Sequence, residues 1–182
     1  MSRMFTTRRD RLFLSMVFGI LIADVITKRL AESSLPLHQP RPVIGDFLRW
    51  TLTYNTGAAM NMTLGASSRV VFSVLAVVMI AVIVKMWRGL PATSSWLAAA
   101  LGMITAGATG NLIDRIRSAQ GVVDFIDVGI GTARFWTFNI ADSGVTVGAI
   151  ILALLTWREP TDEEKKGALS TGAADDTPPP LA

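Results

Sequence analysis

The chain has 182 residues, of which 51% are hydrophobic and 17% are charged, and its formal net charge at pH 7 is +3. Its apolar residues form long blocks with the basic residues at their ends, which predicts a one-domain membrane protein and argues against nucleic-acid binding. Cysteine is absent and histidine occurs once, at His38, which excludes thiol nucleophiles, disulfides and histidine-rich metal sites.

The first predicted element is a transmembrane helix over residues 12–30. The four arginines before it lie at positions 3, 8, 9 and 11, and by the positive-inside rule this cluster places the N-terminus in the cytoplasm. Because no small-residue cleavage site follows Leu30, we expect the helix to be retained.

The segment 31–67 is predicted to be an outer loop that contains a short β element. Within it, Trp50, Leu52 and Tyr54 alternate with polar residues in the sequence WTLTYN. Alternation with a period of two is typical of a strand with one apolar face. We expect this strand to rest at the membrane surface on the extracytoplasmic side.

Three further spans follow, over residues 70–87, 96–113 and 135–157. The span over 96–113 is rich in Ala and Gly, with Ala106 and Gly110 four residues apart, so we expect it to be the most enclosed helix. Four spans return the C-terminus to the cytoplasm. We therefore predict an all-α membrane protein, with a four-helix domain over residues 1–158 and a disordered cytoplasmic tail over 159–182.

Polar side chains recur at the outer ends of three of the predicted helices, at the i, i+3 and i+4 spacing that places them on one helix face. They are Asp24, Thr27 and Lys28 in the first helix, Asn111, Asp114 and Arg115 in the third, and Asn139 and Asp142 in the fourth. Asn55 and Asp124 lie in the outer loops. These polar groups therefore converge on the same leaflet.

For most of these residues, solvation, helix capping or ion pairing is a sufficient explanation. The residues that fit structural ion pairs are Asp24, Lys28, Asp114 and Arg115. By contrast, Asp142 lies inside an apolar run and has no basic residue within one helical turn. Since a carboxylate in lipid is costly unless it is paired or used, Asp124 and Asp142 remain as the predicted functional pair.

Two carboxylates that share a partly apolar site cannot easily both ionise, so one stays protonated while the other remains charged. In an aspartic protease, the ionised carboxylate takes a proton from the attacking water, and the protonated one donates to the developing oxyanion. This chemistry needs neither a metal nor an organic cofactor, which suits the composition of the chain.

Two other functions use the same residues. A lipid-modifying phosphotransferase would bind Mg²⁺ through Asp114, Asp124 and Asp142 at the membrane surface. A small proton-coupled transporter would use Asp24, Lys28 and Asp142 as a relay, although a relay is expected to continue through the membrane. A purely structural membrane protein would leave the pair of aspartates unexplained.

Five short blocks carry these polar residues: DVITK (24–28), YNTGAAM (54–60), GNLIDR (110–115), VVDFIDV (122–128) and FNIADSGVTVG (138–148). In this order, and against the same four spans, they resemble the lipoprotein signal peptidases, the type II bacterial signal peptidases. The resemblance covers nearly the whole chain except its ends.

This resemblance implies a peptidase of the bacterial inner membrane that removes the signal peptide from a prolipoprotein, just before a cysteine that already carries diacylglycerol. It implies that Asp124 and Asp142 are the catalytic pair, and that the cyclic peptide antibiotic globomycin inhibits the protein. The residues implied to line or brace the site are Asn55, Asn111, Asp114, Arg115 and Asn139, with Asp24 and Lys28 in a structural role near it.

Overall fold

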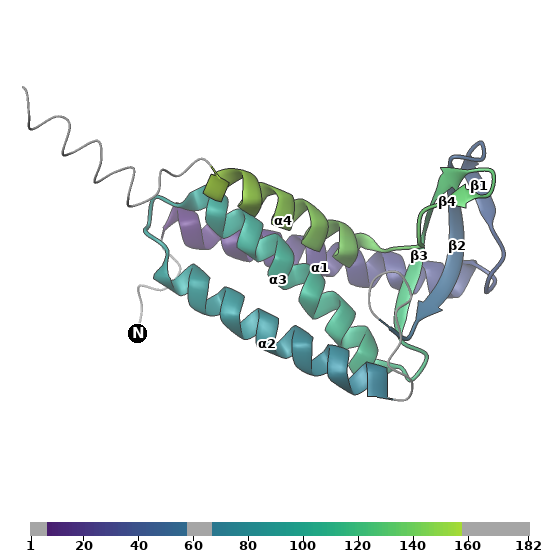
Figure 1. Ribbon diagram of the computed structural model, residues 1–182, viewed down its shortest axis with the longest axis horizontal. Coiled ribbons are helices and arrows are strands. Elements are labelled where there is room, and N and C mark those ends of the chain that lie inside the picture. The colour runs from purple at the N-terminus through teal and green to yellow at the C-terminus, as the bar shows by residue number, and fades with distance from the viewer. Residues whose placement is uncertain (1–6, 58–66, 158–182) are drawn as a thin grey trace, which may run out of the picture.

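The computed structural model describes residues 7–57 and 67–157 (Figure 1). Within these residues, four helices form an elongated bundle, and a small antiparallel sheet lies at one end of it. The helices are α1 (Arg8–Ser34), α2 (Ser68–Gly89), α3 (Ser95–Arg117) and α4 (Ile140–Trp157). The predicted cytoplasmic tail and the arginine at position 3 lie outside the described residues.

Three of these helices, α2, α3 and α4, are long and apolar enough to cross a membrane. The helix α1 has 27 residues, but Asp24, Lys28 and Arg29 interrupt its apolar stretch, and it does not qualify by composition. The helix α4 begins at Ile140, later than the predicted start of its span at Phe135. The reason is that Phe138 is still extended and pairs with Ile126 of the sheet.

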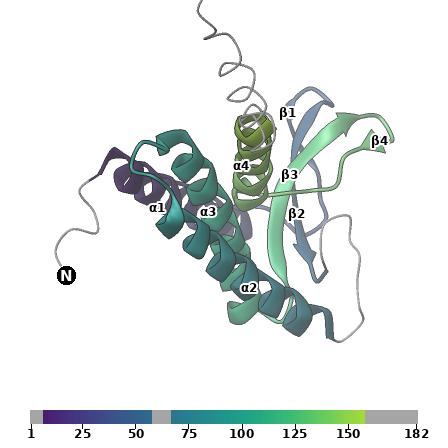
Figure 2. The same cartoon turned by 60° about the vertical axis from the view of Figure 1, so that its left-hand side comes forward.

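The helix α3 is the most enclosed of the three candidate spans, as its small residues predict. Within its apolar stretch 61% is buried, against 17% in α2 and in α4. Figures 1 and 2 show α3 lying between α2 and α4. Small side chains such as Ala98, Ala100 and Ala106 are fully buried there, which lets the neighbouring helices approach closely.

The four helices meet in an apolar core at the end of the bundle away from the sheet. There Phe13 of α1 stacks on Trp87 of α2 with ring centroids 4.2 Å apart, and Leu101 of α3 is buried beside them. Val145 and Leu152 of α4 pack against the same cluster. This core ties α2 to the rest of the bundle at its C-terminal end.

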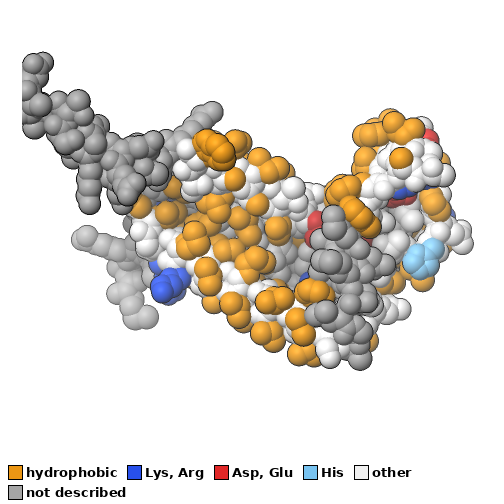
Figure 3. Space-filling model, in the orientation of Figure 1, with side chains coloured by type: hydrophobic (Ala, Val, Ile, Leu, Met, Phe, Trp, Pro, Cys, Tyr) orange, Lys and Arg blue, Asp and Glu red, His pale blue; other side chains and the backbone are white. Residues whose placement is uncertain are grey.

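The outer surface of the bundle is apolar, as lipid exposure requires (Figure 3). Large hydrophobic side chains are exposed along α2 and α4, and the sheet carries others at its tip. Those on α2 are Val70, Val74, Leu75, Val77, Val78, Met79, Val82 and Met86.

The sheet has the strand order β1-β2-β3-β4, with β1 (Arg41–Ile44), β2 (Leu48–Asn55), β3 (Val122–Ile130) and β4 (Ala133–Arg134). The predicted strand in the first outer loop is therefore confirmed as β2. The prediction of a short loop after the third helix is wrong, because that segment forms β3 and β4. In the register of β2 and β3, Thr53 lies opposite Asp124.

The apolar face of β2 rests on the protein and not on the membrane surface. Leu52 is buried with Ala31 at the end of α1 and with Val123 and Phe125 of β3, and Trp50 packs against this cluster. This contact fixes the sheet against the outer end of α1. It also holds β3, and Asp124 with it, beside the helix ends.

Candidate active site

The start of α4 is built by a reciprocal contact between Asn139 and Asp142. The side-chain Oδ1 of Asn139 accepts a hydrogen bond from the Asp142 backbone N–H at 2.9 Å, and Oδ2 of Asp142 accepts one from the Asn139 N–H at 3.2 Å. This is a capping box, in which two residues three apart satisfy free N–H groups of the first turn. It fixes both side chains at the outer end of α4.

Asp124, on β3, is 2% exposed and receives two side-chain amides. Asn139 Nδ2 donates to its Oδ1 at 2.7 Å, and the side chain of Asn55 also hydrogen-bonds to it. Burial, followed by the nearby charge of Asp142, raises the pKa of Asp124 to about 7. A carboxyl with this pKa holds its proton for part of the time at neutral pH.

Asp142 is in a different environment, since both of its carboxylate oxygens accept hydrogen bonds. Asn111 Nδ2 donates to Oδ1 at 2.7 Å, while the backbone N–H of Asn139 donates to Oδ2. Asn139 therefore contacts both carboxyl groups, Asp124 through its Nδ2 and Asp142 through its backbone N–H.

A buried ion cluster lies behind this pair. The ammonium of Lys28 contacts Asp24 and Asp114 at 2.8 Å each, and donates to Asn111 Oδ1 at 3.0 Å. The predicted ion pair of Asp24 with Lys28 is confirmed. Asp24 also accepts the backbone N–H of Ala141 at 2.9 Å, which ties α1 to the first turn of α4.

Asp114 takes part in an ion pair as predicted, and its partner is Lys28 and not the neighbouring Arg115, because consecutive residues on a helix point in different directions. Asp114 contacts Lys28 and accepts the N–H of Val123 at 3.2 Å, so it braces β3. Arg115 instead donates to the carbonyl of Gly57 at 3.0 Å, and its guanidinium lies 5.8 Å from the centre of the Phe72 ring. It thereby links α3 to α2 and to the end of β2.

A cavity of about 1180 Å³ opens in front of the two aspartates. Its polar end contains five of the predicted site residues, namely Asn55, Asn111, Arg115, Asp124 and Asp142. Its apolar walls come from α2 and α4, and include Leu75, Val78, Met79 and Val145. The other four predicted residues, Asp24, Lys28, Asp114 and Asn139, are buried behind the polar end.

The sheet supplies cavity residues that the sequence did not single out. Asp127 is 7% exposed and accepts hydrogen bonds from Thr51 Oγ1 at 2.9 Å and from Arg134 Nη2 at 2.7 Å, while Arg49 Nε lies 3.3 Å away. Asp127 and Arg134 both line the cavity, as does His38. In the sequence, Asp127 is a second acidic residue three positions after Asp124, and this was the signal that could have identified it.

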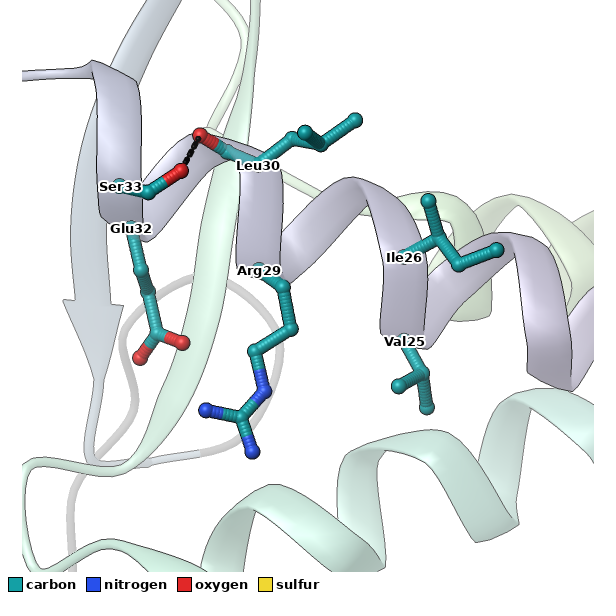
Figure 4. Close-up of a pocket in the computed structure, with 6 residues that line it drawn as sticks. All are labelled: Val25, Ile26, Arg29, Leu30, Glu32 and Ser33. Carbon is teal, nitrogen blue, oxygen red and sulfur yellow. Dashed lines mark hydrogen bonds between the residues drawn. The ribbon is translucent and has the colours of Figure 1, made fainter.

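A second depression, of about 590 Å³, lies on the outer surface of α1 and contains neither aspartate (Figure 4). Arg29 and Glu32 point from the helix in the same direction there, while Ser33 hydrogen-bonds the Leu30 carbonyl at 3.0 Å. Glu32 is used structurally, in an ion pair with Arg117 at 3.1 Å. This depression holds no group of residues suited to catalysis.

The phosphotransferase hypothesis requires Asp114 beside Asp124 and Asp142, but Asp114 is taken up by Lys28 and Val123. Over residues 7–57 and 67–157, the His, Asp and Glu side chains form no group of three that could hold a metal ion. The polar end of the cavity is thus a pair of carboxylates surrounded by amides and an arginine.

The chain is similar in sequence and in fold to known proteins. The family model described as signal peptidase (SPase) II matches residues 16–158. A lipoprotein signal peptidase of Mycobacterium avium (strain 104) is 44% identical over 156 residues, covering 82% of this chain and 80% of its own length. That of Pseudomonas fluorescens is 44% identical over 138 residues, covering 74% and 81%.

The fold is similar to that of a bacterial membrane enzyme solved by the in meso method at 1.9 Å resolution. The TM-score is 0.75 at 28% sequence identity, over 87% of this chain and all of the other. Family model, relatives and fold agree over most of the chain. The protein therefore belongs to the signal peptidase II family.

Proposed function

We propose that this protein is a membrane-embedded aspartyl endopeptidase that removes the signal peptide from diacylglyceryl-modified prolipoproteins, cutting before the lipid-modified cysteine. The observation that carries the proposal is the position of Asp124 and Asp142 at the polar end of a cavity with apolar walls. Membership of the signal peptidase II family supports the substrate class.

In the proposed reaction, Asp142 is the ionised base and Asp124 is the protonated acid. Asp142 takes a proton from a water molecule as that water attacks the scissile carbonyl. Asp124 donates a hydrogen bond, and then its proton, to the carbonyl oxygen as negative charge develops there. The proton on Asp142 then passes to the leaving amine, while Asp124 recovers a proton from the collapsing intermediate, so both carboxyls return to their starting state.

The cavity walls suit a substrate that is partly a membrane helix. Leu75, Val78 and Met79 of α2 face the apolar part, where a signal peptide and acyl chains would exchange contacts with lipid for contacts with protein. At the polar end, Thr53 and Tyr54 of β2 line the cavity beside Asp124. We propose that the extended segment around the scissile bond lies along this strand.

The proposed location is the bacterial inner membrane, with α1 as a fourth spanning helix, both termini in the cytoplasm and the site near the extracytoplasmic face. The buried Lys28 of α1 contacts two carboxylates and an amide oxygen, so the charges of Asp24 and Lys28 are met inside the protein and not by lipid. No cofactor takes part in the proposed reaction. Globomycin is the expected inhibitor.

The test is cleavage of a diacylglyceryl-modified prolipoprotein by the purified protein in detergent with EDTA present. Wild type should cut, and Asp124→Asn and Asp142→Asn should each lose at least about 100-fold of the rate. The matched control is Asp46→Asn, which should keep cleaving because Asp46 is half exposed in the turn between β1 and β2 and does not line the cavity. Activity that depends on added Mg²⁺, or that survives in either dyad variant, would overturn the proposal.

A further inference from the structure

The side-chain amide of Asn111 contacts Asp142, and the orientation of this amide decides whether an N–H donor or a carbonyl oxygen faces the Asp142 carboxylate. Its Oδ1 accepts from Lys28 Nζ at 3.0 Å and from Asn139 Nδ2 at 3.2 Å, while its Nδ2 donates to Asp142 Oδ1 at 2.7 Å. An ammonium has only donors. With Lys28 charged, the opposite orientation of the amide would be repulsive at both ends. Its N–H groups would face the N–H donors of Lys28 and Asn139, and its oxygen would face the carboxylate of Asp142.

Lys28 itself is held in one place. It is 2% exposed, and its three N–H donors are matched by three oxygens, those of Asp24, Asp114 and Asn111. These oxygens come from two helices, since Asp24 is on α1 with Lys28 and the other two residues are on α3. The residue that directs Asn111 is therefore itself fixed.

We infer that Lys28 is a positioning residue that selects which member of the dyad is ionised, because it holds Asn111 with the amide N–H toward Asp142 and not toward the ion cluster. This inference rests on the proposed function, since it concerns the roles of Asp142 and Asp124. Lys28 then does more than contribute to packing, because it affects the acid–base chemistry of the dyad through the side-chain amide of Asn111.

Several other titratable groups surround the dyad, and the test has to separate their effects from that of the amide. Those in or beside the ion cluster are Asp24 and Lys28 on α1 and Asp114, Arg115 and Arg117 on α3, and those lining the cavity from the sheet side are His38, Asp127 and Arg134. Among these, the charge of Lys28 acts directly on Asp124 and lowers its pKa. Loss of Lys28 by this direct route alone would raise the pKa of Asp124 and so move the alkaline limb of activity to higher pH.

An effect of Lys28 that is transmitted through the Asn111 amide predicts a shift of the acid limb of the pH profile. In Lys28→Met, the unpaired carboxylates of Asp24 and Asp114 attract the Asn111 N–H, and its oxygen turns toward Asp142. The ionised form of Asp142 is then less stabilised, so the acid limb of the kcat/KM profile moves to higher pH, by about one pH unit for one lost charge-assisted hydrogen bond. The measurement is the full pH profile of prolipoprotein cleavage.

The matched control is Arg29→Met, which removes the next cation of the same helix. Arg29 is exposed in the depression on α1, and we expect its variant to keep the wild-type profile. Lys28→Met with the wild-type profile, or with a shift of the alkaline limb alone, would overturn the inference. Should Lys28→Met fail to fold, the double variant Lys28→Met with Asp114→Asn keeps the net charge of the cluster, and the same acid-limb shift is expected.

A second variant tests whether the effect of Lys28 passes through Asn111. Asn111→Leu removes both ends of the amide and should shift the acid limb as Lys28→Met does, and adding Lys28→Met to it should shift that limb no further. An additional shift of the same size would overturn transmission through Asn111. Wild-type activity in Asp124→Asn or Asp142→Asn would instead show that the proposed dyad is wrong, which is a different outcome.

Discussion

Asn139 and Asp142 each complete the other's backbone hydrogen bonding at the start of α4, over 2.9 and 3.2 Å. The same side chain of Asn139 reaches Asp124 with its Nδ2, at 2.7 Å. One residue therefore begins the helix and joins the two carboxylates, so folding of the first turn of α4 also assembles the site.

These two roles of Asn139 can be separated by substitution. Asn139→Ser keeps an N-cap acceptor, but it loses the Nδ2 that donates to Asp124, to Asn111 and to the Val123 carbonyl, and should cut at least about 100-fold more slowly. Asn139→Ala removes the cap as well and should be less stable than Asn139→Ser by about 1 kcal/mol. Thermal unfolding in detergent and cleavage assays check both effects. Normal cleavage by Asn139→Ser would contradict the bridging role.

The pKa of Asp124 predicts how stability and activity depend on pH. Because the folded-state pKa is about 7 and the ordinary value is 3.8, the folded protein binds more protons than the unfolded chain between these values. Stability is therefore lost as pH rises from about 4 to 7, by an amount of the order of 4 kcal/mol, and is then constant. Cleavage should fall above pH 7 as Asp124 loses its proton.

Asp124→Asn checks this dependence directly. The variant cannot ionise, so its stability relative to wild type should increase between pH 4 and pH 8. Unfolding curves for both proteins across this range supply the measurement. Curves that stay parallel at every pH would show that the buried carboxyl is not the group that titrates.

Gly110 is required by the close approach of α1 and α3 at the ion cluster. A Cβ at this position would lie 2.5 Å from Asp24 Oδ2, the oxygen that pairs with Lys28. Gly110→Ala should therefore displace that pair, lower stability by about 2 kcal/mol and reduce cleavage. In the control Gly19→Ala, nothing lies within 4 Å of the added carbon, so stability should be unchanged or slightly higher.

Asp127 holds the part of the sheet that lines the cavity. Asp127→Asn weakens its contacts with Arg134, Arg49 and Thr51, and should cost about 3 kcal/mol because the two partly buried arginines then keep only the half-exposed Asp46 as counter-charge. We expect the KM for prolipoprotein to rise more than kcat falls, since the dyad itself is untouched. Arg41→Met, at an exposed position of β1, is the control. An unchanged KM would show that this wall does not bind the substrate.

The sequence predicted those parts of the structure whose signal is local. The Ala- and Gly-rich composition of residues 96–113 identified the enclosed helix, alternation identified β2, and the i, i+4 spacing identified the pair of Asp24 and Lys28. The convergence of Asn111, Asp124 and Asp142 at one end of the bundle was also predicted. The catalytic roles of Asp124 and Asp142 stay a prediction, as does the supporting role of Asn111.

The remaining features depend on contacts between distant segments. The residues from Val122 to Phe125 are all buried, so β3 shows no alternation that would mark it as a strand. Asp114 pairs with Lys28 on another helix and not with its neighbour Arg115, and this pairing depends on how α1 packs on α3. Likewise, the partners of Asp127 come from two other strands, Arg134 from the adjacent β4 and Thr51 and Arg49 from β2, which is more than 70 residues earlier in the chain.

The core formed by Phe13, Trp87 and Leu101 seals the bundle at the end opposite the dyad, while the apolar cavity walls belong to α2 and α4 at the other end. Because the helices pack together at the opposite end, we expect a signal peptide seated there to return to the lipid by the side from which it entered. Turnover then includes a partitioning step between protein and bilayer. Product release should become slower as the match between the severed helix and these walls improves, independently of the rate of peptide-bond cleavage.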